Sequence, residues 1–506
     1  MKGMKKYMEA MTFVLFGATG DLAKRKIFPA LFNLYVDQKL PATFSIIGVG
    51  RRAWSDDEFQ ESVRQSVHEF SRRAQIDSRE LDAFLSACRY AEVDVMEPRA
   101  YVTLYDLVLQ REQELQIPQN RMFYLSVAPQ FFEGIATNVK DSGLGSTTGW
   151  KRLIIEKPFG HDLQSAKELN EKLGKAFSEE EIYRIDHYLG KPMVQNLEAL
   201  EFANPVFQAL WNNQYIANVQ ITANETVGVE DRAGYYEPAG ALRDMLQNHM
   251  LQMLMIIAMQ LPKRITSAHI REEKRKVMAA VRPMKKEEVG THVIRGQYSA
   301  GHIQGTPVAG YRDEPGVDPV SLTETYIATR VWIDDPFWEG VPFYIRTGKR
   351  LQEKSTRIVI EFKNPHEKLY QEQNETPSPN LLIINVNPNE GIALQVNSKN
   401  LTNSGKIEPV TVDFSSGTKD VPEAYELLLF DALRGDSTYF AHWDEVRLSW
   451  EWVTPILEAF AENLVPLFTY EAGSFGPKAA EQLLAADGFV WWLDKVEEQV
   501  PVTATR

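Results

Sequence analysis

The segment 184–191 concentrates groups that could bind an anion or move a proton. Within eight residues it holds a carboxylate, an imidazole, a phenol and an ammonium group, on Asp186, His187, Tyr188 and Lys191. The run 181–185 predicts a strand that ends near Asp186, and Gly190 and Pro192 predict a turn into a helix. The unpaired N–H groups at such a helix start, with these donors beside them, would suit a phosphate dianion. An isolated segment of this kind is more often a solvated loop. Whether it is a binding site therefore depends on other motifs in the chain.

The chain has three further motifs of this kind, 17–24 (GATGDLAK), 156–160 (EKPFG) and 243–249 (RDMLQNH). In order and spacing, the four segments together resemble the glucose-6-phosphate dehydrogenase family, and the resemblance spans the whole chain. Each motif alone is weak, whereas the combination is highly specific. The resemblance implies oxidation of D-glucose 6-phosphate at C1 to 6-phospho-D-glucono-1,5-lactone with hydride transfer to NADP, the first step of the oxidative pentose phosphate pathway.

This reaction needs a base that takes the proton of the sugar hydroxyl. The base must titrate near neutral pH, and histidine is the side chain that does so. By resemblance, His249 is the base, on an expected helix over 240–249. Asp186 is then its orienting partner, whose carboxylate fixes the tautomer and stabilises the imidazolium. A lone His249 would more often be a buried structural histidine. No serine or cysteine nucleophile is expected, because hydride transfer needs no covalent intermediate.

The resemblance also implies a set of substrate-binding residues. Lys157 follows an expected strand, so it would project from the carboxyl edge of a parallel sheet, where ligands bind. In the family this lysine bridges sugar and coenzyme, and the following proline, here Pro158, is commonly cis. The other residues that the resemblance assigns to the sugar or its phosphate are His187, Tyr188, Lys191, Glu225, Asp244, Lys349 and Lys354.

The N-terminal strand, turn and helix have the pattern of a coenzyme loop. Gly17 and Gly20 follow the apolar run 12–16 with GxxG spacing, where the backbone must turn sharply and approach a pyrophosphate; alone, this could be a plain glycine turn. After the next expected strand, 44–50, Arg51 stands where NAD enzymes place an acidic residue, and an arginine there accommodates a 2′-phosphate. We therefore expect NADP as coenzyme, with NAD possible. The expected coenzyme-binding residues are Gly17, Ala18, Gly20, Asp21, Leu22, Lys24, Arg51 and Lys157.

Two kinds of sheet are expected. In the N-terminal part, strands alternate with helices, including a long helical region from 79 to 109, which predicts a Rossmann-like, doubly wound parallel sheet. The remainder has alternating strands with few helices between the later ones, which predicts an α+β region with a mostly antiparallel sheet. We expect a coenzyme-binding domain over 1–190 and a larger domain for substrate binding and oligomerisation over 191–506.

The individual strands follow from local runs of apolar residues. Between the first two strands expected in the C-terminal sheet, the run 251–261 is apolar nearly all round and predicts a buried helix. The strands expected in the N-terminal sheet, besides those above, are 122–127, 152–156 and 182–186; those of the C-terminal sheet are 216–222, 325–332, 358–362, 382–386 and 392–396.

Composition excludes several classes of function. With 55 basic and 69 acidic residues the formal charge is −14, which opposes a general role on nucleic acid or an anionic membrane. The single cysteine, Cys88, cannot form an internal disulfide, no Cys/His spacing predicts a metal site, and a reducing cytoplasm fits. No long uncharged apolar span predicts a membrane segment. The family resemblance implies a homodimer or homotetramer.

Eukaryotic members of this family carry a second, structural NADP site around a Pro-Asn-Glu turn. Here the turn 387–390 is flanked by Asn385, Ala393 and Gln395, where charged or ring-bearing residues would be needed, so we do not expect a second site.

Two other functions stay open. A dehydrogenase of unphosphorylated sugar would leave several buried phosphate donors without a partner, at a cost of several kcal/mol. A non-catalytic NADP-binding sensor of sugar phosphate would not need Asp186 and His249.

Overall fold

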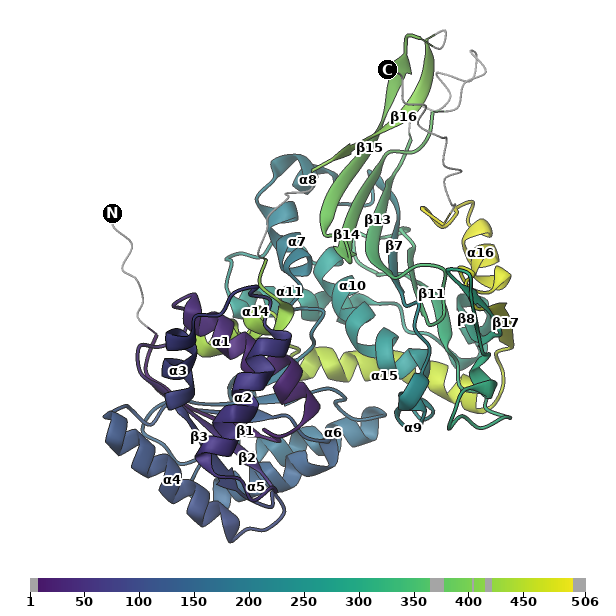
Figure 1. The fold of residues 1–506 in the computed structure, drawn as a ribbon. Helices are drawn as coiled ribbons and strands as arrows, with labels where there is room; N and C mark the ends of the chain where they lie inside the picture. The colour runs from purple at the N-terminus through teal and green to yellow at the C-terminus, as the bar shows by residue number, and fades with distance from the viewer. Residues whose placement is uncertain (1–7, 365–376, 403–404, 415–420, 495–506) are drawn as a thin grey trace. The chain divides into compact units, whose positions relative to one another are not determined.

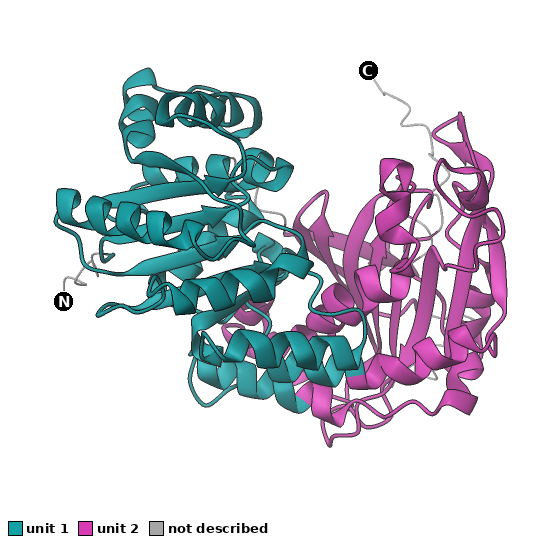
Figure 2. Cartoon of the chain, turned by 90° about the horizontal axis from the view of Figure 1, so that it is seen from below, with its two compact units in different colours: residues 1–196, 259–276, 418–450 teal, residues 197–258, 277–417, 451–506 magenta. Residues whose placement is uncertain are grey.

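A computed structural model describes residues 8–364, 377–402, 405–414 and 421–494. The chain forms two compact units, coloured separately in Figure 2. Unit 1 comprises residues 1–196, 259–276 and 418–450, and unit 2 comprises 197–258, 277–417 and 451–506. The domain boundary that we expect at residue 190, between coenzyme binding and substrate binding, stays a prediction. Within the described residues, no helix is long and apolar enough to cross a bilayer.

Unit 1 is built on a six-stranded parallel sheet with the strand order β3-β2-β1-β4-β5-β6. This confirms the expected doubly wound sheet. The order reverses between β1 and β4, and in such sheets ligands bind outside the carboxyl ends of the strands at that point. The strands are β1 (Met11–Phe16), β2 (Phe44–Gly50), β3 (Cys88–Glu92), β4 (Arg121–Leu125), β5 (Lys151–Glu156) and β6 (Ile182–Ile185).

Helices cover both faces of this sheet (Figure 1). One layer has α1 (Phe28–Val36), α2 (Asp56–Phe70), α3 (Ser78–Ser86) and, packed on α1, α14 (Ala424–Arg434); the other has α4 (Ala100–Leu115), α5 (Phe132–Asp141) and α6 (Leu163–Gly174). Helix α2 begins where Ser55 and Glu58 form a capping box, which satisfies N–H groups that a helix start leaves free.

The prediction of a helical region from 79 to 109 was wrong. Helix α3 ends at Ser86, strand β3 follows, and α4 starts only at Ala100. The short β3 segment joins the sheet because Cys88 pairs with Ile46 of β2, a tertiary contact that local propensity does not reveal. Burial raises the pKa of the Cys88 thiol to about 12, so this side chain acts as a small apolar group.

Unit 2 contains a nine-stranded sheet with the order β16-β15-β14-β13-β7-β12-β11-β8-β17. Of its eight strand pairings, six are antiparallel and only β7 with β12 and β8 with β17 run parallel, so the expectation of a mostly antiparallel sheet is confirmed. The strands are β7 (Ile216–Asn224), β8 (Val293–Ser299), β11 (Tyr326–Val331), β12 (Phe343–Gly348), β13 (Ser355–Phe362), β14 (Leu381–Asn387), β15 (Gly391–Asn400), β16 (Lys406–Asp413) and β17 (Leu467–Glu471).

A continuous helical run crosses unit 2 from residue 242 to 258. Its first part, η5 (Leu242–Met250), has π-helical geometry, and its second part is α10 (Leu251–Ala258). Every residue of α10 is buried, which confirms the expected buried helix. The π geometry of η5 was not expected; π-helical turns are rare and often lie at functional sites.

Further helices and one hairpin lie outside the two large sheets. The helices α7, α11 and α15 contribute residues to both units. The remaining elements are α7 (Pro192–Phe202), α8 (Pro205–Leu210), α9 (Ala233–Tyr236), α11 (Ser267–Ala280), α12 (Val289–His292), α15 (Trp443–Ala461), α16 (Lys478–Ala485) and the hairpin β9 (Gly301–Ile303) with β10 (Thr306–Val308).

Candidate active site

The turn after β1 leaves no room for a side chain at Gly17. Its φ is +80°, and a Cβ there would lie 2.1 Å from the carbonyl oxygen of Ser126, which follows β4. The N–H groups of Gly17 and Ala18 both donate to the Val49 carbonyl, at 2.9 and 3.1 Å. The turn therefore lies at the switch point of the sheet, and its positive φ and the nearby Ser126 backbone require a glycine at position 17.

A helix follows this turn directly. Gly20 donates its N–H to the Gly17 carbonyl at 2.9 Å, and the helix runs through Asp21 and Leu22 into the π-helical segment η1 (Ala23–Ile27). Lys24, whose side chain is partly buried, lies in η1. The helix start thus presents its N–H groups at the strand edge, as an anion site requires.

An exposed pair of arginines follows β2. Arg51 is exposed, and the guanidinium of Arg52 lies over the Trp54 ring, 5.1 Å from its centroid. Trp54 in turn packs against Tyr90 of β3. Arg51 stands beside this stack at the carboxyl end of β2, where an arginine can meet a 2′-phosphate.

Lys157 follows β5 at the same edge of the sheet. The peptide bond between Lys157 and Pro158 is cis, as the family resemblance implied. The next residues are held in place, since the Trp450 indole donates to the Phe159 carbonyl at 3.0 Å. Gly160 has a φ of +82° and packs too closely on the start of α6 to allow a Cβ. The backbone that carries Lys157 is therefore fixed on both sides.

Residues 186–191, which we name the strand-end turn, leave β6 in a tight conformation. Asp186 is buried, and one oxygen of its carboxylate accepts the Tyr188 N–H at 2.9 Å. The Lys191 ammonium lies 4.1 Å from the Tyr188 ring centroid, and the His187 and Tyr188 rings meet at 5.0 Å. The turn leads into α7, which begins at Pro192. The expected strand, turn and helix are present, with the donors gathered at the helix start.

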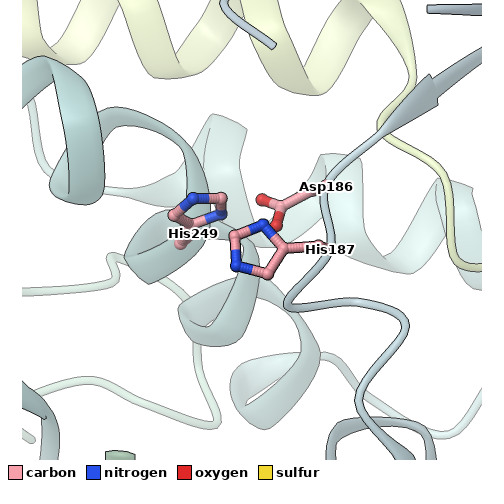
Figure 3. Close-up of side chains that lie close together, drawn as sticks. All are labelled: Asp186, His187 and His249. Atoms are coloured by element: carbon pink, nitrogen blue, oxygen red, sulfur yellow. The ribbon is translucent and has the colours of Figure 1, made fainter. Parts of the chain in front are cut away.

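Figure 3 draws the side chains of Asp186 and His187, which follow β6 in unit 1, and of His249, which lies on η5 in unit 2. Asp186 and His249 are buried, and His187 is partly exposed. These groups have the chemistry of a base and its orienting carboxylate. Their types would also suit a divalent transition metal.

In unit 2, three predicted residues gather at one edge of the sheet; we name Glu225, Lys349 and Lys354 the strand-edge cluster. β7 and β12 are parallel and end in the paired residues Asn224 and Gly348, so Glu225 and Lys349 leave the sheet side by side. Ser355, the first residue of β13, pairs with Asn224 from the other side and brings Lys354 to the same edge. The Lys349 ammonium donates to the Glu225 carboxylate at 2.5 Å, while Lys354 is exposed.

Asp244, on η5, lies near two tyrosines that sequence reasoning missed. The Tyr235 hydroxyl donates to Asp244 at 3.3 Å, and the Lys349 ammonium lies 5.1 Å from the Tyr236 ring centroid. Burial, reinforced by Asp244, raises the pKa of Tyr235 to about 12. Both phenols thus remain donors at neutral pH. The adjacent tyrosines just before the RDMLQNH motif were the available signal.

Glu156 is a second residue that sequence reasoning missed. Its carboxylate accepts the Tyr124 hydroxyl at 2.5 Å and is also hydrogen-bonded by Tyr425. Burial raises the pKa of Glu156 to about 7, against these hydrogen bonds and the charge of Lys157. A titrating carboxyl therefore stands next to the lysine that the family resemblance places on the substrate.

Comparison with known proteins decides the family. Residues 14–196 match the model of the glucose-6-phosphate dehydrogenase NAD binding domain, and residues 198–492 match that of the glucose-6-phosphate dehydrogenase C-terminal domain. The chain belongs to the glucose-6-phosphate dehydrogenase family. The family recognised in the sequence is thereby confirmed.

Individual members of the glucose-6-phosphate dehydrogenase family match over nearly the full length. Glucose-6-phosphate 1-dehydrogenase of Bacillus subtilis is 50% identical over 482 residues, which cover 95% of this chain and 97% of the relative. A solved structure of glucose-6-phosphate dehydrogenase in complex with its substrate glucose-6-phosphate has a TM-score of 0.89 at 34% identity, covering 96% of this chain and 99% of that one. The crystal structure of glucose-6-phosphate 1-dehydrogenase from Mycobacterium avium has a TM-score of 0.81 at 31% identity, with the same coverage.

Proposed function

We propose that this chain oxidises D-glucose 6-phosphate at C1 to 6-phospho-D-glucono-1,5-lactone and delivers the hydride to NADP, the first step of the oxidative pentose phosphate pathway. The observation that carries the proposal is the 50% identity to the Bacillus subtilis enzyme over 95% of the chain. At that identity and coverage, both the coenzyme domain and the substrate domain of the family are present.

His249 is the proposed base, and Asp186 its partner. His249 accepts the proton of the C1 hydroxyl while the hydride leaves C1, and the Asp186 carboxylate stabilises the imidazolium that forms. The burial of both side chains supports this pairing. A bound nicotinamide supplies the hydride acceptor, and the residues of this chain bind, orient and deprotonate the sugar.

The strand-end turn is the proposed phosphate site. His187, Tyr188 and Lys191 can donate to a phosphate, and the start of α7 adds a positive dipole end. The strand-edge cluster, with Asp244, is proposed to bind the sugar. Glu225 and Asp244 can accept hydrogen bonds from hydroxyl groups, and Lys349 and Lys157 can donate to ring and hydroxyl oxygens.

Coenzyme binding is proposed at the turn after β1, through Gly17, Ala18 and Gly20 and the helix start at Asp21 and Leu22. The place of this tight glycine turn at the switch point of the sheet supports the assignment, since ligands bind there in doubly wound sheets. Lys24, Arg51 and Lys157 supply positive charge, and Arg51 favours NADP over NAD.

We also propose a cytoplasmic homo-oligomer, a dimer or tetramer. Exposed apolar side chains at the edge of the unit 2 sheet support self-association: Val410 and Val412 of β16, Phe414 directly after β16 and Leu401 directly after β15.

The test is the absorbance of reduced coenzyme, measured with NADP or NAD on D-glucose 6-phosphate or free D-glucose. The proposal expects reduction with the phosphorylated sugar, faster with NADP, and little with free glucose. Equal rates on both sugars would instead favour the dehydrogenase of unphosphorylated sugar, and no reduction with any pairing would favour the sensor. The variant Arg51→Ala sharpens the coenzyme assignment and should lower the NADP to NAD efficiency ratio about tenfold, the value of one charged contact.

A further inference from the structure

Helix η5 carries Asp244 and His249, yet it begins without a cap from its own sequence. The residue before it, Ala241, has no side chain that could accept a hydrogen bond. Free N–H groups at a buried helix start need a partner. The partner comes from Glu324, 82 residues further along the chain.

Glu324 binds two successive N–H groups at this helix start. Its side-chain oxygen accepts the Leu242 N–H at 3.0 Å, and its backbone carbonyl accepts the Ala241 N–H at 2.9 Å. Gly240 leaves just enough space, since a Cβ there would lie 2.3 Å from the Glu324 carboxylate. Glu324 is buried, with only 7% of its surface exposed. The residue therefore holds the helix start by contacts on both its side chain and its backbone.

The same segment also holds the strand-edge cluster. Thr325, the next residue, accepts the Lys349 N–H on its carbonyl at 2.9 Å. The Tyr470 hydroxyl joins the two, donating to the Lys349 carbonyl at 2.7 Å and bonding the Thr325 hydroxyl at 2.9 Å. Lys349 in turn pairs with Glu225. Residues 324–325 are thus a single rigid link between the start of η5 and the proposed sugar-binding lysine.

We propose that Glu324 is a positioning residue for the dehydrogenase reaction, because it fixes the start of η5, and hence His249 and Asp244, relative to Lys349. This rests on the proposed function. His249 lies seven residues after the capped N–H of Leu242, on the same helix, so a shift of the helix start displaces its imidazole. A misplacement of about 1 Å in an active site can cost about 10²-fold in rate.

The charge of Glu324 matters less than its hydrogen bond. Burial raises the pKa of Glu324, and the Leu242 N–H with the charges of Arg243 and Arg295 oppose that rise. A glutamine keeps an oxygen at the same place, so Glu324→Gln should preserve the cap, whereas Glu324→Ala removes it. Glu361 is a matched control: it is a buried glutamate of the same unit, on β13, that accepts hydrogen bonds from Asn218 and Trp492 instead.

The experiment measures kcat, the KM for D-glucose 6-phosphate and melting temperature for wild type, Glu324→Ala, Glu324→Gln and Glu361→Ala. We expect Glu324→Ala to lower kcat about 10- to 100-fold at a temperature where it is folded, Glu324→Gln to stay within about threefold, and Glu361→Ala to lose stability but keep its kcat. Equal losses of kcat in the two alanine variants, or none in Glu324→Ala, would overturn the proposal.

Amide hydrogen exchange separates this proposal from the proposed function, because it needs no activity. Exchange in residues 240–251 should be faster in Glu324→Ala than in wild type and Glu324→Gln, and unchanged in Glu361→Ala. Unchanged exchange in Glu324→Ala would refute the positioning role. If the wild type reduces no coenzyme, the proposed function is refuted. The exchange result would still show whether Glu324 fixes the start of η5.

Discussion

The two units place their candidate residues by different means. In unit 1, each candidate follows a parallel strand within a few residues: Gly17 after β1, Arg51 after β2, Lys157 after β5 and Asp186 after β6. In unit 2, the candidates depend on contacts between distant parts of the chain, such as the pair Lys349 and Glu225, which are 124 residues apart. The strand order alone brings the unit 1 candidates to one edge of the sheet. The positions of the unit 2 candidates also depend on the strand register and on a helix cap.

Because the unit 1 candidates lie in tight turns at strand ends, the turn at Gly17 should not tolerate even one added methyl group. Gly17→Ala should lower the free energy of unfolding by about 2–4 kcal/mol, because its φ is positive and its Cβ would meet the Ser126 carbonyl. The KM for NADP should rise as well, since the turn must distort. The matched variant Gly174→Ala, at the end of α6 with open space around it, should change stability by no more than about 1 kcal/mol. Equal stabilities, from urea unfolding, would contradict the packed turn.

A second test concerns the buried carboxyl of Glu156 at the end of β5. Its pKa in the folded protein is about 7, above the usual 4.5, so the folded state keeps a proton that the unfolded chain releases between these values. Stability from this group is therefore full below pH 4.5 and falls as pH rises to about 7. Glu156→Gln should remove about 2–3 kcal/mol of the stability difference between pH 5 and pH 8.

Urea midpoints of wild type and Glu156→Gln at the two pH values check this. Tyr124→Phe provides the control, because the Tyr124 hydroxyl lowers the pKa of Glu156 and its loss should extend the falling range above pH 7. An identical pH response of wild type and Glu156→Gln would show that this carboxyl does not titrate in the range.

The strand-edge cluster provides the test for unit 2. Lys349→Ala should raise the KM for D-glucose 6-phosphate about 10- to 100-fold, because it removes a donor and leaves Glu225 without its ion pair. The KM for NADP should change little, since coenzyme binding is assigned to unit 1. Lys354→Ala, which removes an exposed lysine at the same strand edge, should have a smaller effect. A larger effect from Lys354 than from Lys349, in initial-rate kinetics, would reverse this assignment.

Much of the site could be predicted from sequence because its residues belong to local patterns. The apolar run before Gly17 and the strand that ends before Asp186 are both visible within ten residues, and the structure has both. Strand β3 was missed because its membership of the sheet depends on pairing with β2. A five-residue strand carries too little local signal to outweigh the helical patterns on either side.

The contacts that position the unit 2 candidates could not be predicted from the sequence either, because they also join distant segments of the chain. Strand β12 was not expected, so its parallel pairing with β7, which puts Lys349 beside Glu225, could not be foreseen. The cap that Glu324 gives to η5 spans 82 residues and leaves no local pattern. The family resemblance named Lys349 and Glu225, but only the register explains why they meet.

In the proposed reaction His249 moves the proton while His187 helps to hold the phosphate. Steady-state kinetics of His249→Asn and His187→Asn distinguish these two roles. The measurement is kcat and the KM for D-glucose 6-phosphate at saturating NADP, with melting temperatures to confirm that both variants are folded. We expect His249→Asn to lower kcat about 10²- to 10⁴-fold with little change in KM, and His187→Asn mainly to raise KM. The opposite pattern, a raised KM for His249→Asn and a collapsed kcat for His187→Asn, would contradict these roles.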